Sequence, residues 1–149
     1  MPRIMKTLND ISRCQALFRN ESAARGRADG LTPCQHTFVL AICRAPGRTQ
    51  DELARDICLN KSTVARTLAE LERGGFVRRE VNKSDKRCML VYPTEKMLAV
   101  HNEVAEVADL WNAEILSGIS DSEIEIFRSV LVRMNKNARC AVGIEVTEK

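Results

Sequence analysis

The chain has 149 residues, of which 44% are apolar, 29% are charged and only 4% are aromatic, and its formal net charge is +3. This length and composition predict one globular domain with many helices. No apolar run approaches the roughly 20 residues of a membrane span, and the first ten residues lack the apolar core of a signal peptide. We therefore expect a cytoplasmic protein with no membrane partner.

The charge is distributed unevenly along the chain. Residues 1–43 carry a net charge of +3 and residues 44–87 carry +4, whereas residues 88–149 carry −4. A basic segment in the first and middle parts of a small protein favours a polyanionic partner.

Six cysteines are scattered along the sequence, and they form neither a CxxC pattern nor a Cys/His pattern with the spacing of a zinc site. We expect them to be reduced and most of them to be small core residues. The sequence also has no nucleophile with a base at motif spacing, no phosphate-binding glycine loop and no paired carboxylates. We therefore expect no metal, no cofactor and no catalytic activity.

The first two predicted helices have clear limits. The first runs from Ile4 to about Ala28. The second begins at Thr32, where Thr-Pro-Cys-Gln combines an N-cap, a proline at the first helical position and a glutamine that completes a capping box. Pro46 and Gly47 end it.

A helix-turn-helix is predicted next. Thr49 and Glu52 form a second capping box at the start of a short third helix. Cys58 and Leu59 then make a tight connection into a fourth helix at Asn60. A short helix, a brief turn and a helix with polar residues at its front is the arrangement that enters the major groove of DNA.

On the fourth helix, Val64, Leu68 and Leu71 recur at i, i+4 and i+7 and form a buried face. We expect the opposite face of its first two turns to carry short hydrogen-bonding and cationic side chains: Lys61, Ser62, Thr63, Arg66 and Thr67. Such side chains suit base edges and phosphates. The alternative is an ordinary amphipathic helix whose charged face is solvated.

A β-wing is predicted after this helix. Gly74 and Gly75 end the helix where a left-handed residue is needed. A strand begins at Phe76, residues 82–85 have the composition of a turn, and residues 88–92 form the return strand. The pattern predicts a wing of two strands.

Two further helices follow the wing. Pro93 is expected to break the strand, and a long helix then runs to about Ser117, with apolar positions spaced by four and three residues: Met97, His101, Val104, Ala108, Trp111 and Ile115. A last helix begins at a third capping box, Ser120 with Glu123, and ends near Cys140. Its apolar positions are Ile124, Phe127, Leu131 and Met134.

The terminal helices carry more apolar surface than one small winged domain covers, and we expect a second copy of the chain to bury it. The predicted fold is mainly α with a small β-wing. Residues 1–30 and 95–140 are expected to be dimerisation helices, residues 32–93 a winged helix-turn-helix region, and residues 141–149 a tail. A two-fold homodimer reads two half-sites about one DNA turn apart.

The chain resembles MarR-family (multiple antibiotic resistance regulator) transcription factors over most of its length. The resemblance lies in three segments, LTPCQHTFVLAI, PGRTQDELARDICLNKSTVARTLAELERGGFVRRE and DKRCMLVYPTEKM. The wing signature of the family is Asp-x-Arg, five residues, then Leu-Thr-x-x-Gly. Asp85, Arg87 and Thr94 match it, whereas Pro93 and Met97 replace the leucine and the glycine.

The resemblance implies specific contacts with double-stranded DNA. Ser62, Thr63 and Arg66 are expected in the major groove, and Arg87, held by Asp85, in the minor groove. The negative potential of a narrow minor groove favours a guanidinium. For Asp85 and Arg87 the alternative is a solvated pair in a turn.

Lys61, Lys83 and Lys86 are expected to contact phosphates. Such contacts position a protein on DNA but do not specify a sequence. The implied function is a homodimeric DNA-binding regulator, most often a repressor in this family, that reads a pseudo-palindromic operator and is released by a small ligand. A winged helix that contacts protein instead of DNA is the alternative binding class.

The sequence offers candidate residues for two kinds of signal. Family members commonly bind small aromatic acids or phenolics between the dimerisation helices and the winged domain, and His36, Cys43 and Trp111 lie on helices that should border that cleft. Core packing is the alternative for each, and we expect His36 to be half exposed. Some relatives sense peroxides through one cysteine on the first helix, a position that Cys14 shares, but Tyr92 is the only tyrosine, and such sensors usually carry others.

Overall fold

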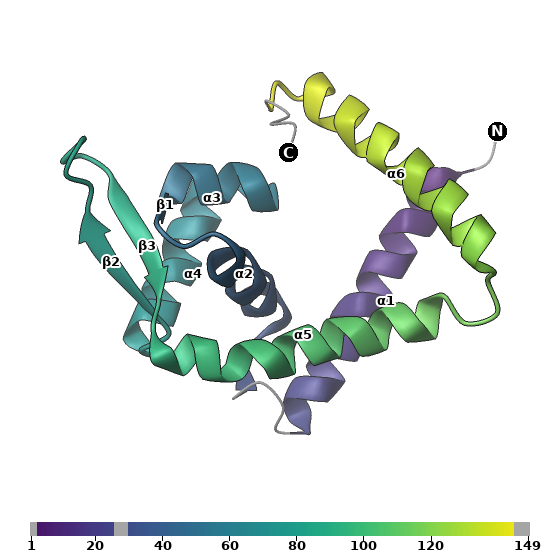
Figure 1. Cartoon of the computed structure of the whole chain (residues 1–149), viewed down its shortest axis with the longest axis horizontal. Helices are drawn as coiled ribbons and strands as arrows, with labels where there is room; N and C mark the ends of the chain where they lie inside the picture. Colours follow the sequence, from purple (N-terminus) through teal and green to yellow (C-terminus); the bar gives the residue numbers. More distant parts are fainter. Residues whose placement is uncertain (1–2, 26–29, 145–149) are drawn as a thin grey trace. The chain divides into compact units, whose positions relative to one another are not determined.

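The computed structural model describes residues 3–25 and 30–144, and these form six helices and three strands. In chain order (Figure 1) they are α1 (Ile4–Ala24), α2 (Pro33–Arg44), β1 (Arg48–Thr49), α3 (Gln50–Ile57), α4 (Lys61–Arg73), β2 (Val77–Val81), β3 (Met89–Pro93), α5 (Glu95–Ile115) and α6 (Asp121–Ala141). The chain divides into two compact units, Met1–Trp111 and Asn112–Lys149. The predicted fold class, mainly helical with a small β-wing, is confirmed.

The three predicted capping boxes are confirmed. In each, the hydroxyl of the N-cap residue accepts a hydrogen bond from the backbone N–H three residues on, and the side chain at that third position accepts one from the backbone N–H of the N-cap residue. The reciprocal pairs are Thr32 with Gln35, Thr49 with Glu52, and Ser120 with Glu123. Local sequence therefore sets where α2, α3 and α6 begin.

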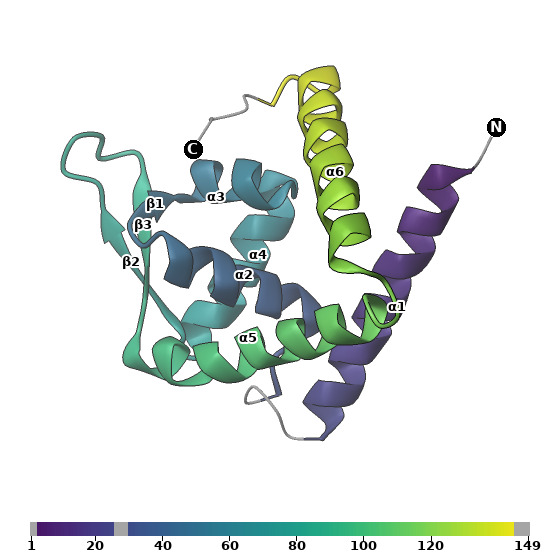
Figure 2. The same cartoon turned by 45° about the vertical axis from the view of Figure 1, so that its right-hand side comes forward.

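In the first unit, α2, α3 and α4 gather beside the sheet, and the β2–β3 hairpin extends away from them (Figures 1 and 2). The core between these elements and α5 is mainly apolar, and its largest apolar side chains are at most 2% exposed: Phe38, Ile42, Leu53, Val64, Leu68, Leu71, Met97 and Val104. The predicted buried face of α4 is thus confirmed. No helix in residues 3–25 and 30–144 is long and apolar enough to cross a membrane.

The wing has a third strand that the sequence did not predict. The order is β1-β3-β2, all antiparallel, and β1 spans only two residues, too few to show alternation. Pro93 was expected to break the return strand, but it pairs with Val77 as the last residue of β3. Proline fits there because β1 pairs only with Leu90 and Val91, so the sheet needs no further N–H on that side.

Two helices are shorter than predicted. α1 ends at Ala24, and Arg25 forms a turn; the predicted end near Ala28 lies outside the described residues. α5 ends at Ile115 instead of about Ser117.

The buried face of α5 also differs from the predicted one. It consists of Met97, Val100, Val104 and Val107, which are spaced by three, four and three residues. The predicted positions His101 and Ala108 are only half-buried. The residues that face the core are instead Val100 and Val107, each one residue earlier in the chain.

Arg48 ties β1 and α3 to the end of α2. Its Nη2 donates to the Ala41 carbonyl at 2.6 Å and its Nε to the Ala45 carbonyl at 3.2 Å. Its Nη1 lies 3.0 Å from Oδ2 of Asp56, and Nη2 of Arg44 lies 2.7 Å from the same oxygen. A cation at the C-terminal carbonyls of a helix is favourable, and this cluster holds α3 against α2.

Replacing Asp56 by asparagine should therefore destabilise the fold. Burial raises the pKa of Asp56, but the hydrogen bonds and charges of Arg48 and Arg44 outweigh burial, so the pKa lies below its ordinary value. At pH 7 we expect Asp56→Asn to lower the free energy of unfolding by about 1.5 kcal/mol, because Arg48 loses a charged partner. A lowered carboxyl pKa stabilises the fold above the pKa of the unfolded chain, so the difference should be complete above about pH 4 and shrink below it.

Urea unfolding at a series of pH values measures this effect. The exposed Asp109 on α5 provides the matched control, and Asp109→Asn should change stability little. A loss for Asp56→Asn that is equally large at pH 3 and pH 7 would show that the Arg48 pair is not its cause.

Candidate nucleic-acid interface

The first turn of α4 is fixed by its own cap. Oδ1 of Asn60 accepts a hydrogen bond from the backbone N–H of Thr63 and another from the hydroxyl of Ser62, both at 2.8 Å. Ser62 and Arg66 are exposed, and Thr63 is half-buried. The front of α4 therefore presents a rigid polar surface on which Ser62 and Arg66 stand outward.

Lys61 is exposed too, but it has a partner. Its Nζ lies 2.7 Å from Oδ2 of Asp51 on α3, and the two side chains are 73% and 52% exposed. Ion pairs this exposed contribute little to stability. A phosphate can therefore replace Asp51 at small cost.

Thr67 does not belong to this surface. It is 5% exposed, so the prediction that it lies on the outer face of α4 is wrong. It follows Val64 by three residues and precedes Leu71 by four, which places all three on one face of the helix. The core thus includes Thr67.

The end of α4 turns the chain directly into the wing. Gly75 has φ +76°, the left-handed conformation that glycine adopts without strain. The N–H of Phe76 donates to the Leu71 carbonyl at 2.8 Å, and that of Gly75 to the Glu72 carbonyl at 3.0 Å. These two bonds form a Schellman motif, as the glycine pair predicted.

Hydrogen bonds and core packing hold the junction between the wing and α5, although its sequence departs from the family signature at two positions. The Thr94 hydroxyl lies 2.7 Å from the Gly75 carbonyl and 2.9 Å from the Phe76 carbonyl. Met97, which stands where the family has glycine, is fully buried in the core. Pro93 continues the β-ladder.

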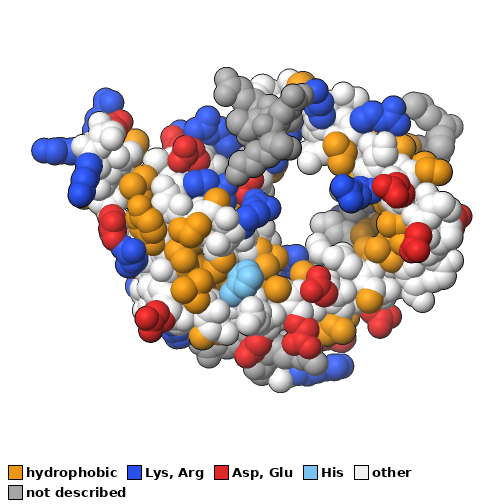
Figure 3. Space-filling view, in the orientation of Figure 1, with side chains coloured by type: hydrophobic (Ala, Val, Ile, Leu, Met, Phe, Trp, Pro, Cys, Tyr) orange, Lys and Arg blue, Asp and Glu red, His pale blue; other side chains and the backbone are white. Residues whose placement is uncertain are grey.

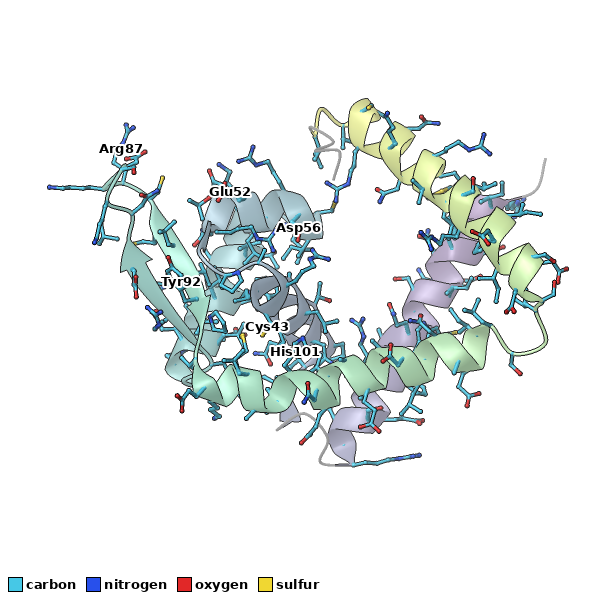
Figure 4. The ribbon with its side chains drawn as sticks, in the orientation of Figure 1. Cys43, Glu52, Asp56, Arg87, Tyr92 and His101 are labelled. Carbon is cyan, nitrogen blue, oxygen red and sulfur yellow. The ribbon has the colours of Figure 1, made fainter. Side chains whose placement is uncertain are left out.

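Lysine and arginine side chains gather at the tip of the wing (Figure 3). Lys83, Lys86 and Arg87 are all exposed there, and Figure 4 shows Arg87 pointing away from the body of the protein. The side chain of Arg87 is 90% exposed, yet Oδ1 of Asp85 lies 3.1 Å from both its Nε and its backbone N. The hydrogen bonds from Arg87 hold the pKa of Asp85 below its usual value. The predicted pair therefore exists and directs a guanidinium into solvent.

His36 is almost completely buried, at 1% exposure, so the expectation of half exposure is wrong. The reason is that α1 packs over the first turn of α2, where Nη1 of Arg19 lies 3.2 Å from the Pro33 carbonyl and 3.3 Å from the Thr37 hydroxyl. Neither ring nitrogen of His36 has a hydrogen-bond partner among the described residues. Burial lowers the pKa of His36, and the positive charge of Arg19 lowers it further. The backbone of Leu31 raises this pKa by a smaller amount, although it forms no hydrogen bond of normal geometry with the ring.

The other two candidate ligand residues are half-buried. Trp111 packs against Phe18 of α1, with ring centroids 5.5 Å apart. Cys43 lies two turns along α2 from His36, and burial raises the pKa of its thiol. Within the described residues, no hydrogen bond or ring contact joins His36, Cys43 and Trp111.

The cysteines are free thiols, but most do not lie in the core. Cys14, Cys34, Cys58 and Cys140 are exposed, which contradicts the prediction. Cys14 stands on the outer face of α1, and its neighbour Arg13 pairs with Asp10 at 3.9 Å. Among residues 3–25 and 30–144, no group of three or more His, Cys, Asp or Glu side chains could hold a metal ion.

Known proteins share both this sequence pattern and this fold. A sequence model of the MarR family matches residues 31–89. YybA of Bacillus subtilis (strain 168), described as an uncharacterized HTH-type transcriptional regulator, is 30% identical over 107 residues, which are 72% of this chain and 71% of YybA. The chain belongs to the MarR family. It is a DNA-binding regulator of transcription, and the expectation that it is not an enzyme is confirmed by this membership.

Solved structures of MarR-type regulators superpose on the chain. The transcriptional regulator SlyA matches with a TM-score of 0.83 and 29% identity, covering 92% of this chain and 94% of SlyA. MarR matches with a TM-score of 0.81 and 28% identity, covering 96% and 97%. A Listeria monocytogenes protein complexed with 26-mer DNA matches with a TM-score of 0.84 and 22% identity, covering 99% and 100%. The winged helix fold is therefore common to all of them.

Proposed function

We propose that the protein is a homodimeric repressor that reads a pseudo-palindromic operator, with α4 in the major groove and the wing tip in the minor groove. The observation that carries this proposal is Arg87, which is 90% exposed but oriented by Asp85. A surface guanidinium gains little stability from such a pair. A narrow minor groove, in contrast, favours a guanidinium that is already directed toward it.

The other contacts follow from exposure and chemistry. We infer that Ser62, Thr63 and Arg66 face base edges, as short hydroxyls and a guanidinium can do. Phosphate contacts are assigned to Lys61, Lys83 and Lys86. The Listeria protein of the same fold was determined with DNA, which supports this choice of partner over a protein.

A second copy of the chain is proposed to cover the terminal helices. No residue of α6 is buried, although α6 carries the apolar stripe Ile124, Phe127, Leu131 and Met134. α1 likewise exposes Ile4, Met5, Ile11 and Leu17. Apolar faces of this extent on a soluble regulator mark an interaction surface.

The proposed signal is a small aromatic or phenolic ligand whose binding releases the protein from DNA. His36, Cys43 and Trp111 are the proposed contacts, and the half-buried Trp111–Phe18 pair offers an aromatic surface for such a ring. Ligand binding that changes the spacing of the two α4 helices would misalign one half-site from the other.

The test begins with a random-sequence DNA pool, from which the wild-type protein enriches a binding sequence, here called the selected duplex. Binding measured across a salt series should weaken steeply, with a slope near −0.9 for each phosphate contact. Arg66→Ala should cost about 1–3 kcal/mol per recognition helix and relax base preference at the positions it reads. If no sequence is enriched at low salt, the proposal is wrong, and a wing that contacts protein is the alternative to test.

A further inference from the structure

The wing carries a second arginine whose environment differs from that of Arg87. Strand alternation places Arg79 on the same face of β2 as Val77, which is 3% exposed, and Arg79 itself is half-buried. Its Nε lies 3.0 Å from Oε2 of Glu72 in the last turn of α4, and its Nη2 donates to the same oxygen. This pair therefore joins the wing to the recognition helix.

Both members of the pair are charged at neutral pH. The hydrogen bonds that Arg79 donates to Glu72 lower the pKa of Glu72 and raise the pKa of Arg79. The cation of Arg79 is consequently paired with a residue of α4 and its side chain is 28% exposed, whereas the side chain of Arg87 is 90% exposed and pairs within its own turn. Arg79 is therefore not placed as a phosphate contact.

The backbone between α4 and β2 does not by itself fix the angle of the wing. The connection is Gly74, Gly75 and Phe76, and a Cβ built on Gly75 would meet no atom within 4 Å. Glycine has the widest choice of backbone conformations, so side-chain contacts are expected to help the backbone hydrogen bonds of the Schellman motif to hold this angle. Besides the Arg79–Glu72 pair, Nζ of Lys96 lies 3.0 Å from the Gly74 carbonyl and 4.3 Å from the centre of the Phe76 ring.

The neighbouring arginine supplies a useful contrast. Arg78 points to the other face of the strand, where its guanidinium lies 4.6 Å from the centre of the Tyr92 ring and it pairs with Glu80. Those contacts stay within the wing. The Arg79–Glu72 pair instead crosses from the wing to α4.

We propose that Glu72 and Arg79 form a strap that fixes the wing relative to the recognition helix, so that Arg87 reaches the minor groove while α4 occupies the major groove. The strap rests on the proposed function. Glu72 and Arg79 are positioning residues, because they act through Arg87 and not by touching DNA.

The sign of the effect of Glu72→Ala tests the strap. Removing an acidic side chain close to a polyanion strengthens binding by general electrostatics, and it would also release Arg79 to bind phosphate. The strap predicts the opposite, a binding to the selected duplex about 3- to 30-fold weaker than wild type. The matched control is Glu70→Ala, an exposed site on the same helix, which should bind as well as wild type or better. Alanine favours helix at both sites.

Non-additivity gives a second readout. If the strap acts through Arg87, the double variant Arg79→Ala/Arg87→Ala should bind no more weakly than Arg87→Ala alone. Exchanging the charges in Glu72→Arg/Arg79→Glu should recover binding that each single reversal loses. Arg79→Lys keeps the charge but loses the planar guanidinium, and should weaken binding even if Glu72→Ala fails to fold.

The outcomes separate the strap from the proposed function. Wild-type or tighter binding by Glu72→Ala, or losses for Arg79→Ala and Arg87→Ala that add, would overturn the strap. If Arg66→Ala and Arg87→Ala themselves bind like wild type, the proposed function fails first. If Arg66→Ala and Arg87→Ala bind the selected duplex more weakly than wild type but Glu72→Ala does not, the proposed function stands and only the strap is overturned.

Discussion

Arg87→Ala is expected to weaken binding to the selected duplex about 30-fold or more. An arginine that contacts a groove contributes about 1–3 kcal/mol, and a homodimer brings two copies to one operator. Because the two wings of the proposed dimer would occupy separate half-sites, their losses should add to about 2–6 kcal/mol, and 1.4 kcal/mol is a factor of ten in affinity. Fluorescence anisotropy with labelled duplex at fixed salt measures this loss.

Two neighbouring variants show whether position or charge matters at the wing tip. Nε of the Arg87 guanidinium donates a hydrogen bond to Oδ1 of Asp85 at 3.1 Å. Arg87→Lys keeps the charge but loses the planar guanidinium, so it should retain only part of the affinity that Arg87→Ala loses. Lys86→Ala removes the adjacent exposed cation, and should weaken binding equally for all sequences and make the salt dependence less steep. If Arg87→Ala and Lys86→Ala behave alike, Arg87 is a phosphate contact and does not read the minor groove.

Local chemistry made much of the fold predictable. A capping box involves residues three apart, and the Schellman motif at Gly75 involves residues within one turn, so each was evident in the sequence. The burial of Val64 and Leu68 followed from helical period alone. The burial of Thr67 had the same basis, but its hydroxyl suggested a surface position.

Features that depend on distant partners were not predictable. β1 exists because β3 lies beside it, and a two-residue strand has no pattern of its own. Cys58 closes α3 in the left-handed conformation, with φ +55°, where sequence alone favours glycine or asparagine. His36 is buried because α1 covers the first turn of α2, and no local pattern brings those two helices together.

The same limit applies to the site. Asp85 and Arg87 are two residues apart and share one turn, so their pairing could be inferred from a family signature. Glu72 and Arg79 are seven residues apart on a helix and a strand, and their contact requires the chain to fold back at Gly75. Helical spacing and strand alternation each describe one partner, but neither describes the pair.

Placing charges on α6 is expected to have the largest effect on binding. α6 has 21 residues and none is buried, and Phe127 is 50% exposed. A helix in water owes most of its stability to packing of its apolar face, so in the proposed dimer a second copy must cover Phe127 and Leu131. Phe127→Glu/Leu131→Glu should therefore give a monomer, as measured by sedimentation at micromolar concentration.

A monomer would seat only one recognition helix at a time, so its affinity for the selected duplex should fall by about 10²- to 10⁴-fold. Ser129→Glu is the matched control, because residue 129 lies two positions from both mutated sites and hence about 200° around the helix from them. That variant should remain a dimer and bind like wild type. A double variant that stays dimeric would place the interface elsewhere, and a monomer that binds with unchanged affinity would show that each head reads DNA independently.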